Sequence, residues 1–208
     1  MTAPANRDDT DRPEGTGRFE RALAAIDAAN GADPNLVQTP HGPRPKELAH
    51  AELLSMWVRR LRPDASEVLL LATRAHHIRR WLVPRSSAPA GRAGYLGWRR
   101  GLHDFHAAQL APLLADVGYD ATTIARVQEI VRKDHLARDA EVQTLEDALC
   151  LVFLDQQLDA LASSVGDEEK MVSILRQSWR KMSPAGREFA LGLELTPAGL
   201  ALVQRALA

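Results

Sequence analysis

Two adjacent histidines, His76 and His77, end an apolar run and are followed within eight residues by three arginines and a tryptophan. Imidazole rings serve as metal ligands and as acid–base groups near neutral pH. Guanidinium groups bind phosphate or carboxylate through two parallel hydrogen bonds, and an indole ring can stack on a base or a sugar. The stretch therefore predicts an anion-binding site beside a metal site. The residues selected to bind the anion are Arg79, Arg80, Trp81 and Arg85. Arg99, Arg100 and Trp98 on a later segment could join the same cluster.

Further candidate ligands lie on other segments with helical spacing. His106 falls on the apolar face of its segment, and Asp147 falls on the apolar face of the run 145–154. A carboxylate buried there without a cation, a metal or a donor would be costly. Imidazoles and carboxylates from separate helices can converge in the core of a bundle. We predict a site for a divalent ion (iron, manganese, zinc or nickel) with the ligands His50, His76, His77, His106 and Asp147.

Each of these residues also has a purely structural interpretation. Successive helical residues point about 100° apart, so His76 and His77 cannot both face one metal from a regular helix. One of them would be a ligand or acid–base group, and the other its hydrogen-bonding partner. Histidines also cap helix C-termini, and Asp147 could be a buried acid paired with an arginine, whereas Glu146 is expected to be solvated. The acid–base role is assigned to His77 and Lys133.

Almost every periodic segment has helical spacing, and none alternates for long enough to form a strand. The predicted helices cover residues 18–30, 46–61, 64–78, 95–118, 120–133, 141–163, 167–182, 184–193 and 197–208. Asp64 and Asp120 are the predicted N-caps of two of them. The connection 31–45 is rich in proline and glycine and long for a compact domain, so we expect it to lie across a site. The fold class predicted is all-α: a single-domain helical bundle over residues 17–208, behind a disordered tail of residues 1–16.

The bulk properties exclude several classes of protein. A chain of 208 residues with 45% apolar residues can form one domain with a sizeable core. A net charge of −1 does not favour nucleic acid or anionic lipid as a partner. The single cysteine, Cys150, cannot form an internal disulfide, and we expect no apolar stretch of the roughly 18 residues that cross a bilayer. The N-terminus is acidic and polar, unlike a signal peptide, so we expect a cytoplasmic protein that does not bind a membrane.

Several motifs support a resemblance to known families. The stretches HIRRWLVPRS, GYLGWRRGLHDFHA, GYD, VRKDHL and QTLEDALCLVFLD resemble the family of domain of unknown function 4202, from about Phe19 to the C-terminus. Over residues 46–160, the order of the candidate ligands also resembles the HD-domain superfamily of metal-dependent phosphohydrolases. His77 stands where that superfamily has an aspartate that bridges two metals. Because a neutral imidazole does not readily bridge metals, the resemblance implies one metal ion or none.

The leading hypothesis is a metal-dependent HD-like hydrolase that acts on a small phosphoester or nucleotide. In such a site the metal activates water and the cations stabilise charge on the transferring group. One alternative is a non-catalytic helical module that binds an anionic partner, such as RNA or a phosphorylated metabolite, and that would show salt-sensitive binding without turnover. A second alternative is an HD-like iron oxygenase. We favour a small anionic, phosphorylated substrate over nucleic acid.

Overall fold

The computed structural model describes residues 17–208, so the predicted tail of residues 1–16 lies outside the described residues. Over the described part the chain forms an all-α domain, as the helical spacing predicted. The helices are α1 (Arg18–Gly31), α2 (Lys46–Leu61), α3 (Glu67–Ala75), α4 (Gly91–Asp116), α5 (Ala121–Arg132), α6 (Ala140–Val152), α7 (Leu158–Val165), α8 (Glu168–Lys181), α9 (Pro184–Leu191) and α10 (Pro197–Leu207). Two 3-10 turns, η1 (Arg80–Leu82) and η2 (Arg85–Ser87), connect α3 to α4.

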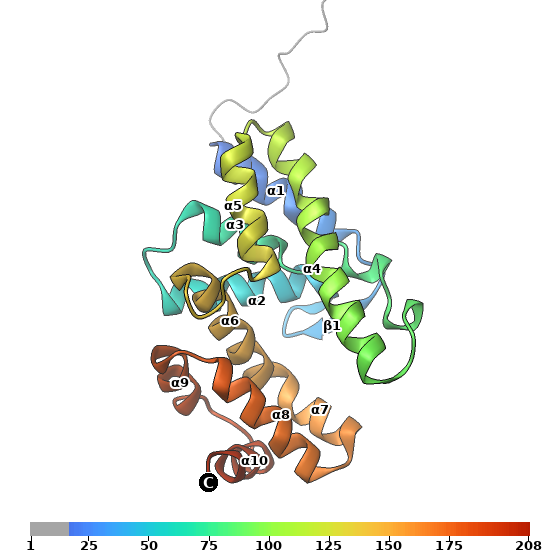
Figure 1. Cartoon of the computed structure of the whole chain (residues 1–208), viewed down its shortest axis with the longest axis vertical. Coiled ribbons are helices and arrows are strands. Elements are labelled where there is room, and N and C mark those ends of the chain that lie inside the picture. The colour runs from blue at the N-terminus through green and yellow to red at the C-terminus, as the bar shows by residue number, and fades with distance from the viewer. Residues whose placement is uncertain (1–16) are drawn as a thin grey trace, which may run out of the picture.

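The helices gather at two ends of an elongated molecule. Helices α1, α3, α4 and α5 lie at one end and α7 to α10 at the other, and α6 runs between them (Figure 1). Helix α5 packs along both α4 and α3, and α2 packs against α3 and α6. One apolar core joins these elements. Its fully buried side chains include Ile26, Leu54, Leu71, Leu110, Ile130, Leu145 and Leu151.

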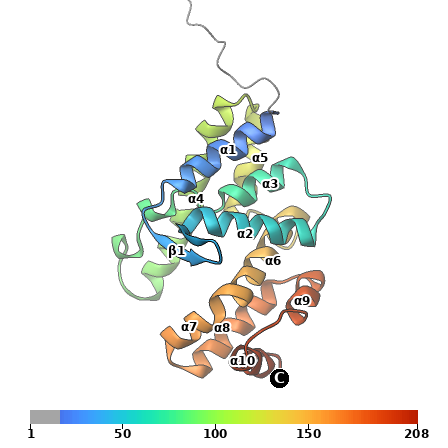
Figure 2. The same cartoon turned by 180° about the vertical axis from the view of Figure 1, so that it is seen from behind.

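The connection 31–45 contains a small hairpin that the sequence did not predict. Strands β1 (Leu36–Thr39) and β2 (Gly42–Pro45) pair antiparallel and lie beside α2 (Figure 2). The prediction that no strand forms is wrong here, because strands of four residues with three nearby prolines are too short to show alternation. The buried carboxylate of Asp33 anchors the hairpin, since it accepts hydrogen bonds from the backbone of Asn35 at 2.9 Å and of Glu47 at 3.0 Å.

The helix caps agree with one prediction and contradict another. Asp120 caps α5 by accepting from the backbone N–H of Thr123 at 2.8 Å, as predicted. Asp64 does not cap α3, because the helix begins three residues later. Ser66 takes this position and accepts from the N–H of Leu69 at 3.1 Å, which is the spacing that an N-cap requires.

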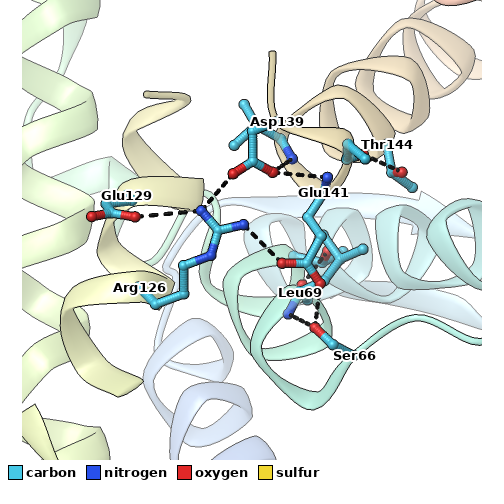
Figure 3. Close-up of polar contacts among 10 residues, drawn as sticks. Ser66, Leu69, Arg126, Glu129, Asp139, Glu141 and Thr144 are labelled. Atoms are coloured by element: carbon cyan, nitrogen blue, oxygen red, sulfur yellow. Dashed lines mark hydrogen bonds and ion pairs between the residues drawn. The ribbon is translucent and has the colours of Figure 1, made fainter. Parts of the chain in front are cut away.

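A network around Arg126 fixes the connection between α5 and α6 (Figure 3). Its guanidinium lies 2.7 Å from Asp139, the N-cap of α6, and donates to Glu141 at 2.9 Å. Glu141 in turn accepts a hydrogen bond from Ser66 at the start of α3. The network therefore ties three helices together around the segment 133–139, which carries Lys133.

Helix α6 is the central buried helix that the sequence predicted. It contacts α2, α3, α5, α8 and α9, and it continues through a π-helical turn, η3 (Phe153–Gln157), into α7. By length and composition the whole segment Ala140–Val165 is apolar enough to cross a membrane, which differs from the expectation that no such stretch exists. Core helices pass the same test, and the packing of α6 on five neighbours is that of a core helix.

Candidate active site

Four imidazole rings from three helices meet in one cluster. His50 comes from α2, His76 and His77 follow the end of α3, and His106 comes from α4. The ring of His77 stacks on that of His50 with 4.6 Å between centroids and on that of His76 at 4.7 Å, and it lies 5.8 Å from that of His106. The prediction of a helix to residue 78 is wrong: α3 ends at Ala75 and the chain turns. This early end lets two adjacent rings join one cluster, which a regular helix would prevent.

Hydrogen bonds orient two of these rings. His106 is 1% exposed, and its Nδ1 lies 2.8 Å from the carbonyl oxygen of Ile78. Because a carbonyl only accepts, Nδ1 carries the proton and Nε2 of the neutral ring keeps a free lone pair. His77 Nδ1 lies 3.2 Å from the buried carboxylate of Glu47 on α2. Within residues 17–208, His50 Nε2, His76 Nδ1 and His106 Nε2 are buried and have no hydrogen-bond partner.

Burial keeps the cluster uncharged at neutral pH. It lowers the pKa of His50 to about 3 and that of His106 to about 4. The pKa values of His76 and His77 are also well below the ordinary value, mainly because of burial and then because of neighbouring imidazoles. Burial raises the pKa of Glu47. The cluster therefore offers neutral nitrogen atoms, the form in which imidazole binds a metal or accepts a proton.

A small cavity of about 90 Å³ lies against the imidazoles. Three cations line it: Arg80 after α3, Arg99 from α4 and Lys133 after α5. The other lining residues are His76, His77, Tyr95, Trp98, Leu102, His103 and His106. None of the described residues that line it is a carboxylate. The cavity is therefore suited to an anion, because neutral imidazoles and cationic groups line it and no carboxylate of the described residues does.

Lys133 is held in place by a buried ion pair. Its ammonium lies 2.6 Å from the carboxylate of Glu146 on α6, and Lys181 at the end of α8 lies 3.3 Å from the same carboxylate. The side chains of Lys133 and Glu146 are only 12% and 5% exposed, so the prediction that Glu146 is solvated is wrong. Burial lowers the pKa of Lys133. For Glu146, burial alone would raise the pKa, but the charges of Lys133 and Lys181 outweigh it, so the pKa of Glu146 is lowered.

The backbone at Lys133 is in the left-handed region, with φ of 62°. This residue ends α5 in the position that glycine most often takes, and its N–H bonds to the carbonyl of Ile130 at 3.0 Å. A side chain at this position costs about 1 kcal/mol relative to glycine. The fold therefore accepts backbone strain in order to place a lysine side chain at the cavity.

A family model described as "Domain of unknown function (DUF4202)" matches residues 20–203. The chain belongs to the DUF4202 family. No curated protein and no solved structure matches it.

The DUF4202 fold places the other predicted site residues outside the cavity lining. Arg79 donates to Gln109 at 2.8 Å. Arg85 donates to the carbonyls of residues 88 and 89, and its guanidinium lies 6.0 Å from the rings of Tyr95 and Trp98 at the mouth of the cavity. Trp81 lies on η1 and does not line the cavity.

Asp147 is buried as predicted, at 3% exposure, and its partners are Ser183 at the start of α9 and Gln143 on its own helix. It accepts from the N–H of Ser183 at 2.8 Å, from the Ser183 hydroxyl at 2.5 Å and from Gln143 at 2.9 Å. Both carboxylate oxygens are thus used to hold the N-cap of α9, which supplies the donors that a buried carboxylate needs.

The sequence did not indicate the roles of Glu47, Tyr95 or Leu102, whereas Trp98 was named as a stacking ring and does line the cavity. Arg99 had been grouped with the arginines but not selected as a site residue. One signal was present for Tyr95, Trp98, Arg99 and Leu102, because these positions recur at intervals of three and four and form one face of α4 with His106. Glu47 gave no signal, since its contact with His77 spans thirty positions in the chain.

The donor chemistry of the cluster suits a divalent ion, although its arrangement is not that of a formed metal site. A metal-binding histidine commonly uses its second nitrogen for a hydrogen bond to a carbonyl or carboxylate, as His106 and His77 do here. Three further buried imidazole nitrogens have no partner within residues 17–208. In the same part of the chain, no group of three or more His, Cys, Asp or Glu side chains is arranged so as to hold a metal ion. Ligation would therefore require the rings to rotate.

Proposed function

We propose that this chain is a metal-dependent hydrolase that acts on small phosphorylated compounds. One observation carries the proposal: a cluster of four neutral imidazoles, three of which (His76, His77 and His106) line a small cavity together with three cationic side chains, while the fourth, His50, stacks on His77 behind the lining. Burying so many polar groups is costly, and the fold does not use the free nitrogens of His50, His76 and His106 for hydrogen bonds. A perturbed, desolvated group of this kind is typical of active sites.

Each part of the cavity has a role in this proposal. His50, His76 and His106 would hold the ion through their free nitrogens. When bound, a divalent ion lowers the pKa of water and withdraws charge from a phosphoryl oxygen. Arg80 and Arg99 would bind the phosphate oxygens, since guanidinium groups match their geometry.

His77 and Lys133 would handle protons. The contact with Glu47 orients His77 and leaves its second nitrogen free to accept a proton. Lys133 carries a positive charge next to the imidazoles, and its lowered pKa favours loss of a proton to a leaving group.

The likeness to the HD-domain superfamily is part of the same proposal. The histidines follow one another along the chain in the order that the likeness requires, and their rings lie in one cluster. His77 in place of an aspartate, and the engagement of Asp147 by Ser183, favour one metal ion rather than two.

Metal content and turnover test the proposal together. Purified protein would be incubated with Mn²⁺, Fe²⁺, Zn²⁺ or Ni²⁺, desalted, and its metal measured by elemental analysis. We expect close to one ion per chain, hydrolysis of p-nitrophenyl phosphate that depends on it, and loss of both in His106→Asn. The exposed His41 gives a matched control, since His41→Asn changes a histidine outside the cluster. Wild-type protein that retains none of the four metals would refute the proposal.

A second candidate is a module that binds a phosphorylated metabolite without turnover. It is favoured by the pairing of Lys133 with Glu146, which supplies a cation at the cavity without a metal. This candidate predicts phosphate binding that is equal with and without metal ions and that weakens as salt rises. Metal-dependent hydrolysis would exclude it.

A further inference from the structure

The shape of the cavity limits what it can hold. Its volume is about 90 Å³. Sites for whole drug-sized ligands are usually about 300 Å³ or larger. A phosphoryl group, with one phosphorus and its oxygens, is close to the available size, whereas a nucleotide or a second organic arm is too large.

The charge of the cavity matches a doubly charged group. Within residues 17–208, neither Arg80 nor Arg99 forms an ion pair with a carboxylate; Arg80 instead lies over the ring of Trp98 at 5.0 Å, and Arg99 lies 5.8 Å from that of Tyr95. Neither charge is therefore paired directly with a described carboxylate, although the charge of Arg80 acts on the carboxylate of Glu47, where it partly offsets the rise in pKa that burial causes. Lys133 adds a third charge that Glu146 partly offsets.

Two aromatic rings stand at the mouth of the cavity. Tyr95 is 42% exposed, and its ring lies 6.1 Å from that of Trp98. The indole N–H of Trp98 donates to the carbonyl of Val83 at 3.1 Å, which fixes the ring before any ligand arrives. The half-buried, fixed ring of Trp98 and the exposed ring of Tyr95 beside it form a surface on which a flat or cyclic group can stack.

The geometry points to a phosphomonoester that enters with its phosphate first and whose organic part is a ring lying against Tyr95 and Trp98. This inference names a substrate class for the proposed function. It rests on the proposed function for the location of the site, but it does not require that the site hydrolyses the ligand. A phosphodiester is disfavoured, because the enclosed part of the cavity accepts one phosphoryl group and a second arm would compete with the imidazoles and cations for its oxygens. Inorganic phosphate fits the cavity but lacks the stacking contact.

The test is a set of binding measurements on the full chain by isothermal titration calorimetry, in the presence of a chelator so that no turnover occurs. The three probes are inorganic phosphate, phenyl phosphate and diphenyl phosphate. We expect phenyl phosphate to bind about tenfold more tightly than inorganic phosphate, which is the size of one stacking contact. Diphenyl phosphate should bind at least about tenfold more weakly than phenyl phosphate, because its second ring cannot enter.

Two variants test whether Tyr95 provides the preference for phenyl phosphate over inorganic phosphate. Tyr95→Leu should reduce the ratio between phenyl phosphate and inorganic phosphate from about tenfold to about one. Arg92→Met, which changes an exposed residue on the first turn of α4 outside the cavity lining, should keep the wild-type ratio. The inference is overturned if diphenyl phosphate binds as well as phenyl phosphate, if Tyr95→Leu keeps the full ratio, or if none of the probes binds.

Adding a divalent metal and measuring phenol release separates this inference from the proposed function. If the binding pattern holds and no phenol appears with any metal, the substrate class stands and the hydrolase proposal fails. If phenol is released from the monoester and the diester at similar rates, the hydrolase proposal stands and the inference fails.

Discussion

The buried imidazoles should make the metal-free protein sensitive to mild acid. His50, His76 and His106 stay neutral in the fold because burial lowers their pKa values, whereas in the unfolded chain each titrates near its ordinary value of about 6.5. Below that value the unfolded chain binds more protons than the folded one, so the free energy of unfolding decreases as the pH falls. The contribution is complete above about pH 6.5 and is lost progressively toward the folded pKa values, which are about 3 for His50 and about 4 for His106.

The size of the effect follows from the three rings that each have a buried nitrogen without a hydrogen-bond partner within residues 17–208. At about pH 5.5, one unit below the ordinary pKa, each ring that remains neutral lowers the free energy of unfolding by about 1.4 kcal/mol. Three such rings give about 4 kcal/mol, a large part of the 5–15 kcal/mol or so that is typical of a folded domain. Glu47 opposes this change slightly, because its raised pKa favours the folded state as the pH falls. Glu146 and Asp139 have lowered pKa values, so their contributions are lost only below about pH 4.5, outside the window.

Urea denaturation followed by circular dichroism would measure the effect, in the presence of a chelator, at several values between about pH 7.5 and pH 5.5. His106→Asn should reduce the loss from about 4 to about 3 kcal/mol, and the asparagine amide can still donate to the carbonyl of Ile78. His41→Asn, at an exposed position, should leave the loss unchanged. A wild-type stability that varies by less than about 1 kcal/mol over this range would refute the account of the cluster.

Three substitutions test the packing around the site, each by thermal unfolding. Lys133→Met leaves Glu146 with one exposed partner, Lys181, and should lower the free energy of unfolding by about 3 kcal/mol. Adding Glu146→Gln should recover much of this loss. If the effects of the two substitutions simply add, the buried ion pair is contradicted. Asp147→Ala should lower the free energy of unfolding by about 2–3 kcal/mol because Ser183 loses its acceptor, while phosphate binding is retained. If a folded variant does not bind phosphate, Asp147 is part of the binding site. Gly186→Ala should cost about 1–3 kcal/mol, because its new Cβ would lie 2.6 Å from the Asp147 carboxyl carbon; unchanged stability would show that this contact is loose.

The sequence predicted most of the helices because their periodicity and caps are local. Helix α2 begins and ends where its pattern predicted, and Asp120 caps α5. The hairpin was missed because its stability comes from pairing and from Asp33 rather than from alternation.

The site was predicted less completely, because its contacts join distant positions. The histidines that were selected do form one cluster. Of the two neighbouring acids, Asp147 is buried as predicted and meets Ser183, whereas Glu146, which was predicted to be solvated, is buried against Lys133. On a helix these two carboxylates point about 100° apart, and only the positions of α5 and α9 decide which of them meets the lysine.

The position of Glu146 has a consequence for the C-terminal helices. Its carboxylate bridges two ammonium groups, one belonging to the cavity and one to the last turn of α8. An anion that attracts Lys133 weakens the first half of this bridge, and the remaining negative charge then acts on Lys181 alone. A ligand in the cavity would thereby act, through a single carboxylate, on a helix that contributes no side chain to the cavity wall.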